Sequence, residues 1–397
     1  MRPVILGCGN IGSNVASSLI KRHGGLELIV ADKNLQAAQS LASRLGNRAK
    51  ALPVDVNNQE ELERVVSSGD VVLNTIGPFY RTALPVIDAA IKRKVHYIDI
   101  NDDHDVAATL VFDPSYDERA KQAGTMILIG CGATPGFTNL LAKLACDRLD
   151  QPRTIRLCWV VPFFLEGFSP GIMDHLFHML TGDVIQFIDG KHQPVAAYSG
   201  VRNVEFLPPF RTYPAYYSGH GEPVTLGHFI PGLEEATIRS YFFPQAADDL
   251  MRMLVDRGFG NREIVAGADI SPLDFLTSYA ATESGRASLG VDLQGETVGF
   301  ASQVEVCGSK GADEVKIIFE EQGLLGGGES QTLDSTPVCA RLALEGVMDG
   351  SITGTGFLAP EACIDPVPFI NAVIAETGKS VHQREEIIRK NVFKEPG

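Results

Sequence analysis

The sequence predicts an α/β fold: a doubly wound parallel sheet with helices on both faces, and a second domain that carries a mixed sheet. Three observations support this prediction. Short apolar runs of strand length alternate with helical patterns through the first third of the chain. From about residue 151 that rhythm gives way to strand-like runs separated by longer polar stretches. The chain has 397 residues, more than a single hydrophobic core usually covers, so two domains are expected.

Composition and charge narrow the class of protein. Apolar residues make up 44% and charged residues 21%, which is ordinary for a globular protein. The net charge of −15 argues against nucleic acid as a partner, because an acidic surface repels phosphate groups. No apolar run approaches the ~20 residues that span a bilayer, so no membrane association is expected. The seven cysteines show no C-x-x-C spacing, and we expect no metal site and a reducing, cytoplasmic location.

The first predicted strand leads directly into a glycine-rich turn. Residues 3–6 (PVIL) are followed by GCGNIG at 7–12, by a helical pattern, and by a second strand at 26–30. In such a turn Gly7 permits the tight bend, Gly9 lets a pyrophosphate approach the backbone, and Gly12 lets the helix pack on the strand. The helix begins near Asn10 and Ile11, where unpaired N–H groups can bind phosphate.

An acidic residue completes this pattern twenty positions after the last glycine. Asp32 follows the second strand and can accept hydrogen bonds from ribose hydroxyls. The combination is typical of dinucleotide binding in a Rossmann domain. Since a carboxylate repels a 2′-phosphate, NAD is expected in preference to NADP. Lys33 comes next and could contact a 2′-phosphate, which keeps NADP open as the alternative.

The carboxyl ends of the later strands supply further candidate residues. Strands are expected at 49–54, 70–74, 95–100 and 125–130. Ligands of parallel sheets bind beyond these ends. We therefore expect Asp55 near the adenine and the sequence Gly77, Pro78 and Phe79 around the nicotinamide. The residues expected to face the substrate are Asp99, Asn101 and Asp102, with a helix cap or a surface acid as the alternative role of Asp99.

The sixth strand is followed by a second glycine-rich segment, GCGATPGFTN at 130–139, and then by an apolar helix. A helix that starts behind glycines and a proline can present free N–H groups to a carboxylate. We expect Thr138, in this first turn, to contact the substrate, while an ordinary helix start is the alternative.

The second domain is expected to form the substrate pocket. Residues 210–232 are rich in aromatic, glycine and polar residues, as small-molecule pockets require. Strands are expected around 153–161, 194–198, 205–206, 296–308 and 313–321. Helices are expected at 335–348 and 366–390.

Together these motifs resemble the saccharopine dehydrogenase-like family, whose members are NAD(P)-dependent enzymes acting on C–N bonds of amino acids. The matching segments are GCGNIG (7–12), Asp32, DVVLNTIGPF (70–79), HYIDI (96–100), GCGATPGFTNLLA (130–142) and GFLAPE (356–361). The layout is similar to that of lysine 6-dehydrogenases, and also to that of saccharopine reductases. The resemblance implies a Rossmann domain at residues 1–132 plus 333–397, completed by the C-terminal helices. It also implies an inserted substrate-binding and dimerisation domain at residues 133–332, a homodimer and no metal. The segment at 220–223 departs from the lysine 6-dehydrogenase pattern.

The expected reaction is hydride transfer between a nicotinamide and a carbon bonded to nitrogen. An ammonium group must lose a proton before it can lose hydride, so a base is required. His220 has the appropriate pKa range for a base, and Glu222, Asp99 or Asp102 could orient it or bind the ammonium. Arg239 is expected to grip a carboxylate, with Arg211 as the alternative. Tyr213 lies in the same aromatic stretch and is expected to line the pocket.

Three functions remain open from the sequence. The first is oxidative deamination of an amino acid or diamine, as in lysine 6-dehydrogenases. The second is reduction of an imine formed from an amine and a carbonyl, as in saccharopine or carboxynorspermidine reductases. The third is a Rossmann protein that senses redox state by binding NAD without catalysis, which would need no proton-handling residue.

Overall fold

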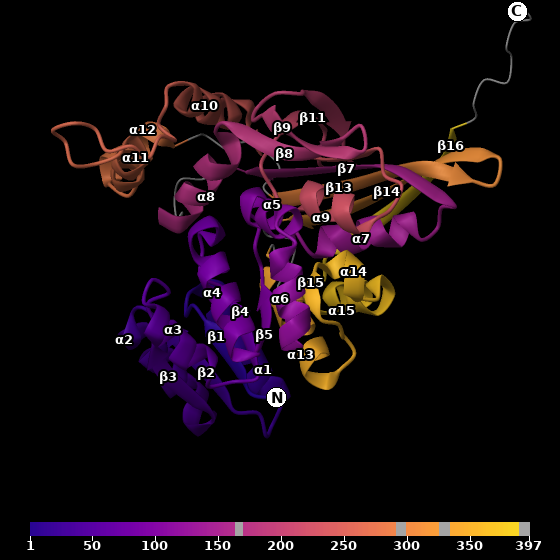
Figure 1. Cartoon of the computed structure of the whole chain (residues 1–397). Coiled ribbons are helices and arrows are strands. Elements are labelled where there is room, and N and C mark those ends of the chain that lie inside the picture. Colours follow the sequence, from indigo (N-terminus) through magenta and orange to yellow (C-terminus); the bar gives the residue numbers. More distant parts are fainter. Residues whose placement is uncertain (163–169, 291–298, 325–333, 389–397) are drawn as a thin grey trace, which may run out of the picture. The chain divides into compact units, whose positions relative to one another are not determined.

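The computed structural model describes residues 1–162, 170–290, 299–324 and 334–388. The chain forms two compact units (Figure 1). The first unit contains Met1–Leu140 and Asp334–Thr377, and the second contains Leu141–Leu333 and the chain from Gly378 onward. The predicted split of the first domain is therefore present in the fold. The segment from Gly378, which we expected in the first domain, groups with the second unit.

The first unit is built on a seven-stranded sheet in which every pairing is parallel. Its strand order is β15-β6-β5-β4-β1-β2-β3. Strands β2 and β3 extend the sheet on one side of β1, and β4 to β6 extend it on the other side. The predicted Rossmann fold is confirmed, and β15 is a strand that we did not expect. The strands are β1 (Pro3–Leu6), β2 (Leu28–Asp32), β3 (Ala49–Pro53), β4 (Val71–Asn74), β5 (His96–Asp99), β6 (Met126–Leu128) and β15 (Gly356–Leu358).

Helices cover both faces of this sheet (Figure 1). On one face α1 packs against α2 and α13, and on the other α4 packs against α3, α5 and α6. Since α13 reaches β4 and β5, the C-terminal helices complete the domain as predicted. The helices are α1 (Asn10–Arg22), α2 (Leu35–Leu45), α3 (Gln59–Val66), α4 (Phe79–Arg93), α5 (His104–Phe112), α6 (Ser115–Ala123), α13 (Thr336–Asp349), α14 (Pro360–Cys363) and α15 (Pro366–Thr377), with a 3-10 turn at Gly46–Arg48.

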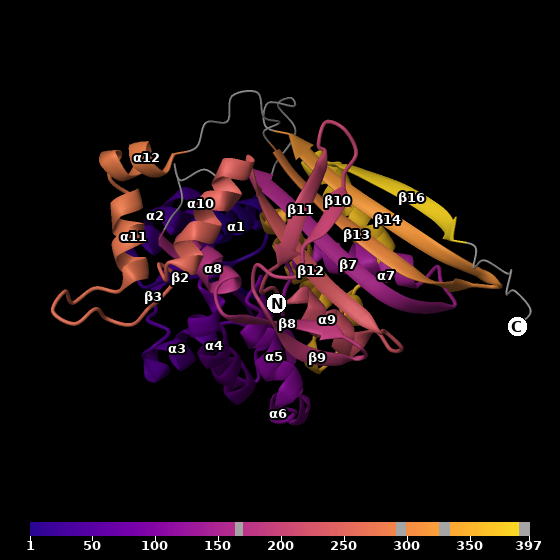
Figure 2. The same ribbon diagram turned by 90° about the horizontal axis from the view of Figure 1, so that it is seen from above.

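The second unit is built on a nine-stranded mixed sheet, as predicted (Figure 2). The main path runs β10-β11-β12-β7-β13-β14-β16, and the hairpin β8-β9 is attached to β12. Only the pair β12-β7 is parallel among the described strands of this sheet. The strands are β7 (Gln151–Pro162), β8 (Asp183–Ile188), β9 (Lys191–Ala196), β10 (Arg202–Glu205), β11 (Thr212–Tyr217), β12 (Glu235–Phe243), β13 (Gly299–Lys310), β14 (Asp313–Leu324) and β16 (Ser380–Ile388).

Shorter helices accompany this sheet. Helix α9 packs against β8 and β12, and α10 packs against β12. These contacts fix the loop between β11 and α9, which carries the predicted base. The helices are α7 (Phe137–Cys146), which includes the junction of the two units, α8 (Pro170–Leu180), α9 (Glu222–Phe229), α10 (Gln245–Asp256), α11 (Pro272–Ala280) and α12 (Glu283–Leu289). No described helix is long and apolar enough to cross a membrane.

The C-terminal segment differs from the prediction. We expected one helix over 366–390, but α15 ends at Thr377 and Gly378 has a φ of +65°. A residue in that conformation terminates a helix, and glycine adopts it without steric cost. The following residues form β16, which pairs antiparallel with β14. Residues 389–390 of the predicted helix, and 296–298 of the predicted strand at 296–308, lie outside the described residues.

Candidate active site

The glycine-rich turn of the first unit has the geometry that the sequence predicts. Gly7 has a φ of +95°, a conformation that disfavours other residues. A Cβ atom at Gly12 would lie 1.9 Å from the carbonyl oxygen of Gly7, so only glycine fits where the helix crosses the turn. At Gly9 no heavy atom of the described residues, apart from its two chain neighbours, lies within 4 Å of a built Cβ. The space beside Gly9 is therefore open, as a bound pyrophosphate would require.

The first turn of α1 is accessible. Gly9 caps the helix without a side-chain hydrogen bond, and Gly9 and Asn10 are exposed while Ile11 is half-buried. The side chain of Asn10 accepts a hydrogen bond from Asn14 at 2.9 Å. These features fit the predicted phosphate site at the start of α1.

Asp32 binds the glycine turn directly. Its carboxylate accepts the backbone N–H of Cys8 and that of Asn34, each at 2.8 Å. This residue therefore stabilises the turn whichever cofactor is bound, while the remaining lone pairs can still accept ribose hydroxyls. Lys33 forms an ion pair with Asp55 at 3.0 Å. The backbone N–H of Asn57 and the ammonium of Lys33 both lower the pKa of Asp55.

The loop after β4 borders the turn. The hydroxyl of Thr75 donates to the carbonyl of Leu6 at 2.8 Å, which ties the loop to the end of β1. Gly77 is exposed and Pro78 half-buried, so both can line a cofactor site. Phe79 is the first residue of α4 and is 5% exposed, so its side chain belongs to the core rather than to the loop surface.

Asp99 is fully buried and hydrogen-bonded within the first unit. Its Oδ1 accepts the N–H groups of Asn101 and Gly130 at 2.9 and 2.8 Å, and its Oδ2 accepts the hydroxyl of Tyr97 at 2.8 Å. Burial raises the pKa of Asp99 to about 7, against the lowering effect of these hydrogen bonds. The prediction that Asp99 contacts the substrate therefore needs correction: its carboxylate joins the ends of β5 and β6.

The neighbours of Asp99 divide into two kinds. Asn101 is 1% exposed and its side chain bonds both the N–H and the carbonyl of Asp103, so it shapes its own turn. Asp102 is half-buried and stays a candidate for substrate contact. Asp103, which the sequence reasoning missed, is buried and accepts the N–H of Tyr80 at 2.8 Å, in the first turn of α4.

The loop at 130–139 is closed on itself. The N–H groups of Phe137 and Thr138 donate to the carbonyls of Gly132 and Ala133 at 3.0 and 3.1 Å. These two N–H groups are therefore not available to an anion at the start of α7. Thr138 is 3% exposed, so the substrate contact predicted for it has no support here.

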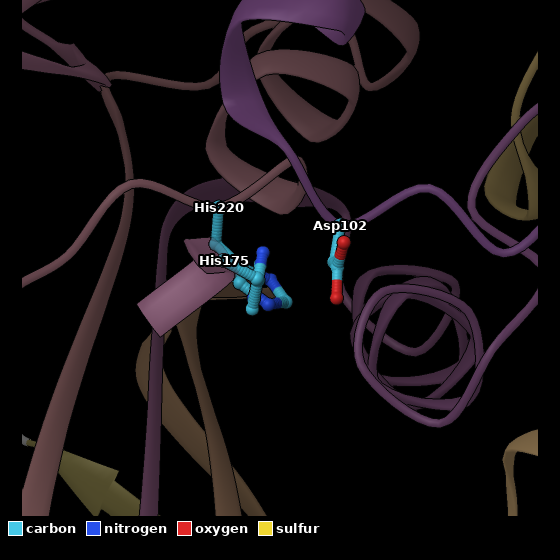
Figure 3. A group of neighbouring side chains, drawn as sticks. All are labelled: Asp102, His175 and His220. Atoms are coloured by element: carbon cyan, nitrogen blue, oxygen red, sulfur yellow. The ribbon is translucent and has the colours of Figure 1, made fainter. Parts of the chain in front are cut away.

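In the second unit, His220 and Glu222 form a buried pair. The Nδ1 atom of His220 lies 2.5 Å from Oε2 of Glu222, and the two residues are 3% and 0% exposed. His220 lies between β11 and α9, and Glu222 is the first residue of α9. His175, on α8, places its ring centroid 6.1 Å from that of His220 (Figure 3). The predicted histidine and glutamate are thus brought together.

An indole ring flanks His220. The ring centroid of Trp159 lies 6.3 Å from that of His220 and 5.7 Å from that of Phe242. Among the described residues, the buried Nε1 of Trp159 and the buried hydroxyl of Ser218 have no hydrogen-bond partner. An unpaired indole N–H beside a histidine suits a ligand that carries an acceptor atom. We did not predict these residues, although Trp159 is the single tryptophan of the chain.

Strand register places a row of polar side chains on the same face as Trp159. Trp159 pairs with Ser240 on one side and with Ser302 on the other, and Ser302 pairs with Glu321. Paired residues of neighbouring strands share a face. Glu321 is fully buried and bonds the ammonium of Lys379 at 2.5 Å and the hydroxyl of Ser302 at 3.1 Å.

Tyr213 and Arg239 lie on the opposite face of this sheet. Arg239 pairs with Cys158, the neighbour of Trp159 in β7, so its side chain points the other way. Its guanidinium lies over the ring of Tyr217 and donates to the carbonyl of Gly200, and burial lowers its pKa.

Tyr213 belongs to the hydrophobic cluster of that opposite face. Its ring stacks on Phe243 with centroids 5.8 Å apart, and the cluster also contains Cys158 and Tyr241. Arg211 is exposed, with its guanidinium 5.9 Å from the centre of this ring. The predicted substrate set of Tyr213, Arg239 and His220 is therefore separated by the sheet, and the first two are corrected to structural roles.

Comparison with known proteins agrees with this fold and turn. The family described as the saccharopine dehydrogenase NADP binding domain matches residues 4–128. A carboxyaminopropylagmatine dehydrogenase from Synechocystis sp. is 25% identical over 402 residues, which cover 96% of each chain. The chain is similar in sequence to the saccharopine dehydrogenases. It is an NAD(P)-dependent oxidoreductase, and the sequence resemblance is confirmed.

Two saccharopine dehydrogenases extend the comparison. The NADP(+), L-glutamate-forming enzyme of Schizosaccharomyces pombe is 28% identical over 273 residues, which cover 64% of this chain and 57% of that protein. The apo L-Glu-forming enzyme from Saccharomyces cerevisiae aligns with a TM-score of 0.63 at 18% identity, covering 97% of this chain and 99% of that one. The second likeness shows that both chains share one fold.

Proposed function

We propose that this saccharopine dehydrogenase-like protein transfers hydride at a C–N bond of an amino acid or diamine, with His220 as the proton acceptor. The observation that carries the proposal is the buried His220–Glu222 pair beside Trp159. The nicotinamide, when bound, accepts or donates the hydride. The open space at Gly9 and the accessible first turn of α1 fit the pyrophosphate of such a cofactor.

The direction of the hydrogen bond gives His220 its role. Glu222 is acceptor-only when ionised, so Nδ1 of His220 donates to it and Nε2 keeps its lone pair. A carboxylate in this position fixes the tautomer and orients the ring. His220 can then take the proton of a substrate ammonium at Nε2, or return it when the reaction runs toward reduction.

The substrate class is the finer part of the proposal. Oxidative deamination of lysine or a similar amine follows from the resemblance stated above. The second candidate, reduction of an imine formed from an amine and a carbonyl, is favoured by the relative that matches 96% of the chain, because its name denotes an agmatine with a carboxyaminopropyl group. The net charge of −15 is compatible with a cationic amine in either case.

For the cofactor we propose NAD, because the carboxylate of Asp32 lies at the end of β2, where it would repel a 2′-phosphate. NADP is the second candidate, since the matching family is described as NADP-binding and Lys33 is exposed. Asp32→Asn keeps one acceptor oxygen and removes the charge. We expect it to shift the ratio of kcat/KM values toward NADP by about tenfold, and an unchanged ratio would reject Asp32 as the selectivity determinant.

One screen tests the reaction. The protein is incubated with NAD or NADP and with L-lysine, diamines or ω-amino acids, and in parallel with NADH or NADPH and mixtures of amine and carbonyl compound. Formation of NADH or NADPH supports deamination. Consumption of NADH or NADPH only with the mixtures supports reduction of an imine, the second candidate. Cofactor binding without turnover in any arm would leave the sensor function, and the proposed reaction would be abandoned. The homodimer is a further proposal, which analytical ultracentrifugation of the purified protein would test.

A further inference from the structure

Three buried side chains connect the loop after β4 to the core of the first unit. Asn74 ends β4, and Tyr97 and Asp99 lie in β5; each is fully buried. The Nδ2 atom of Asn74 lies 3.1 Å from the hydroxyl of Tyr97, and this hydroxyl lies 2.8 Å from Oδ2 of Asp99. At the other end, Oδ1 of Asn74 lies 3.0 Å from the backbone nitrogen of Ile76.

Each hydrogen bond in this series is donated toward Asp99. The N–H of Ile76 can only donate, so Oδ1 of Asn74 accepts and its amide group donates to Tyr97. The hydroxyl of Tyr97, whose pKa is raised by burial and by Asp99, keeps its proton and donates to that carboxylate. Both N–H groups at Oδ1 of Asp99 also donate to it. The carboxylate is the single acceptor at which the series ends.

We propose that Asn74, Tyr97 and Asp99 are positioning residues that hold the loop at 75–78 for the nicotinamide end of the cofactor. The proposal rests on the proposed function and on the expectation from the sequence that Gly77 and Pro78 border the nicotinamide. Ile76 is the last residue before Gly77, so its N–H bond to Asn74 sets where the exposed part of the loop begins. The carboxylate of Asp99 therefore acts on the loop through the side chains of Tyr97 and Asn74.

Two substitutions interrupt the series at different points. Tyr97→Phe keeps the ring and removes the hydroxyl, which leaves Asn74 without its acceptor. Asp99→Asn keeps the shape but presents an NH2 group to a network of donors, so either orientation of the amide sets a donor against a donor. Thr125→Val is the matched control, because Thr125 is fully buried just before β6 of the same sheet and its hydroxyl has no partner among the described residues.

The test measures binding of two probes to the full-length protein. Reduced cofactor reports the whole site, whereas ADP-ribose, with a 2′-phosphate if NADPH is the cofactor, reports the adenosine and pyrophosphate parts alone. For Tyr97→Phe and Asp99→Asn we expect about tenfold weaker binding of reduced cofactor, as the loss of one or two buried hydrogen bonds implies. Binding of ADP-ribose should stay within about twofold of wild type, and Thr125→Val should change neither.

Hydrogen exchange gives a readout that does not depend on the reaction. The amide of Ile76 should exchange faster in both variants and remain protected in Thr125→Val. Protonation of Asp99 puts a donor where the network needs an acceptor, so wild type should bind the cofactor more weakly at low pH, and Asp99→Asn should show no such change. The titratable groups that face Asp99 are Tyr97 on its strand, Asp102 after it and Cys131 after β6.

The outcomes separate the two proposals. If wild type binds no reduced cofactor, the proposed function fails. If wild type binds it and both variants bind it equally well, the positioning role is wrong. If both variants lose affinity for cofactor and ADP-ribose alike, the network is a general structural element and the specific role at the nicotinamide loop is also wrong.

Discussion

At the residue scale, the chemistry of the site depends on which nitrogen of His220 is free. Because Glu222 occupies Nδ1, only Nε2 can accept a proton. His220→Gln retains a polar side chain of similar reach and cannot act as a base. We expect kcat to fall by about 10²–10⁴ near neutral pH with a smaller change in KM, since general-base catalysis contributes on that order. Steady-state kinetics over a pH series measures both constants.

A matched control and a partner variant refine that test. His382→Gln removes an exposed histidine of β16 and should leave the kinetics unchanged. Glu222→Gln keeps the hydrogen bond but removes the charge, so activity should fall less than in His220→Gln. Equal activity of wild type and His220→Gln would show that another group accepts the proton.

Asp99 makes the stability of the first unit depend on pH. Burial raises its pKa from the ordinary value of 3.8 to about 7 in the folded protein, so the folded state favours the protonated form. The contribution of Asp99 to the free energy of unfolding is fully present below pH ~4 and is lost as pH rises through 7. Denaturant titrations should show wild type losing up to about 4 kcal/mol relative to Asp99→Asn between these limits. A constant difference between the two proteins across this range would contradict the burial argument.

At the element scale, substitutions in the turn between β1 and α1 distinguish effects on folding from effects on cofactor binding. Gly9→Ala meets no protein atom within 4 Å, so the protein should fold with an unchanged melting temperature while cofactor binding weakens by tenfold or more, about the effect of blocking a pyrophosphate. Gly12→Ala would place Cβ 1.9 Å from the carbonyl of Gly7, so it should lower both stability and binding. Gly25→Ala, which also has open space, is the neutral control.

Thermal unfolding with and without NAD(P)H distinguishes these variants. Ligand-induced stabilisation should persist in Gly25→Ala and be clearly smaller in Gly9→Ala. Full stabilisation of Gly9→Ala by the cofactor would mean that the phosphates do not approach this glycine.

Local patterns predicted the first unit better than the second. The turn, the acid at position 32 and the alternation of strands and helices are encoded within short stretches of sequence, so they could be read in order. β15 and β16 were missed because each forms by pairing with a distant strand, β6 and β14 respectively. Such pairing depends on long-range packing, which a single sequence does not reveal.

The candidate site, too, could be predicted from the sequence only where its residues lie close together in the chain. His220 and Glu222 are two positions apart, and the hydrogen bond between them could be anticipated. Tyr213 and Arg239 were placed in the same pocket because they are near in sequence or charged, but strand register puts them on the other face. Register also brings Trp159 beside His220, from a strand much earlier in the chain.

At the scale of the whole molecule, the chain builds the second unit between two parts of the first. Lys379, just after the last helix of the first unit, forms a buried ion pair with Glu321 in β14. This pair fixes the start of β16 in the second sheet, and one partner alone would leave an uncompensated buried charge. The return of the chain to the second unit is the part of the domain organisation that the sequence did not reveal.

The central claim is that hydride moves between the nicotinamide and a carbon bonded to nitrogen. The most direct test uses reduced cofactor labelled with deuterium at C4 of the nicotinamide, with the amine and carbonyl mixture that the screen identifies. Mass spectrometry and NMR of the product should place the deuterium on the carbon bonded to nitrogen, and His220→Gln should form far less of it. Deuterium on a carbon without nitrogen, or product formation without label, would contradict the account.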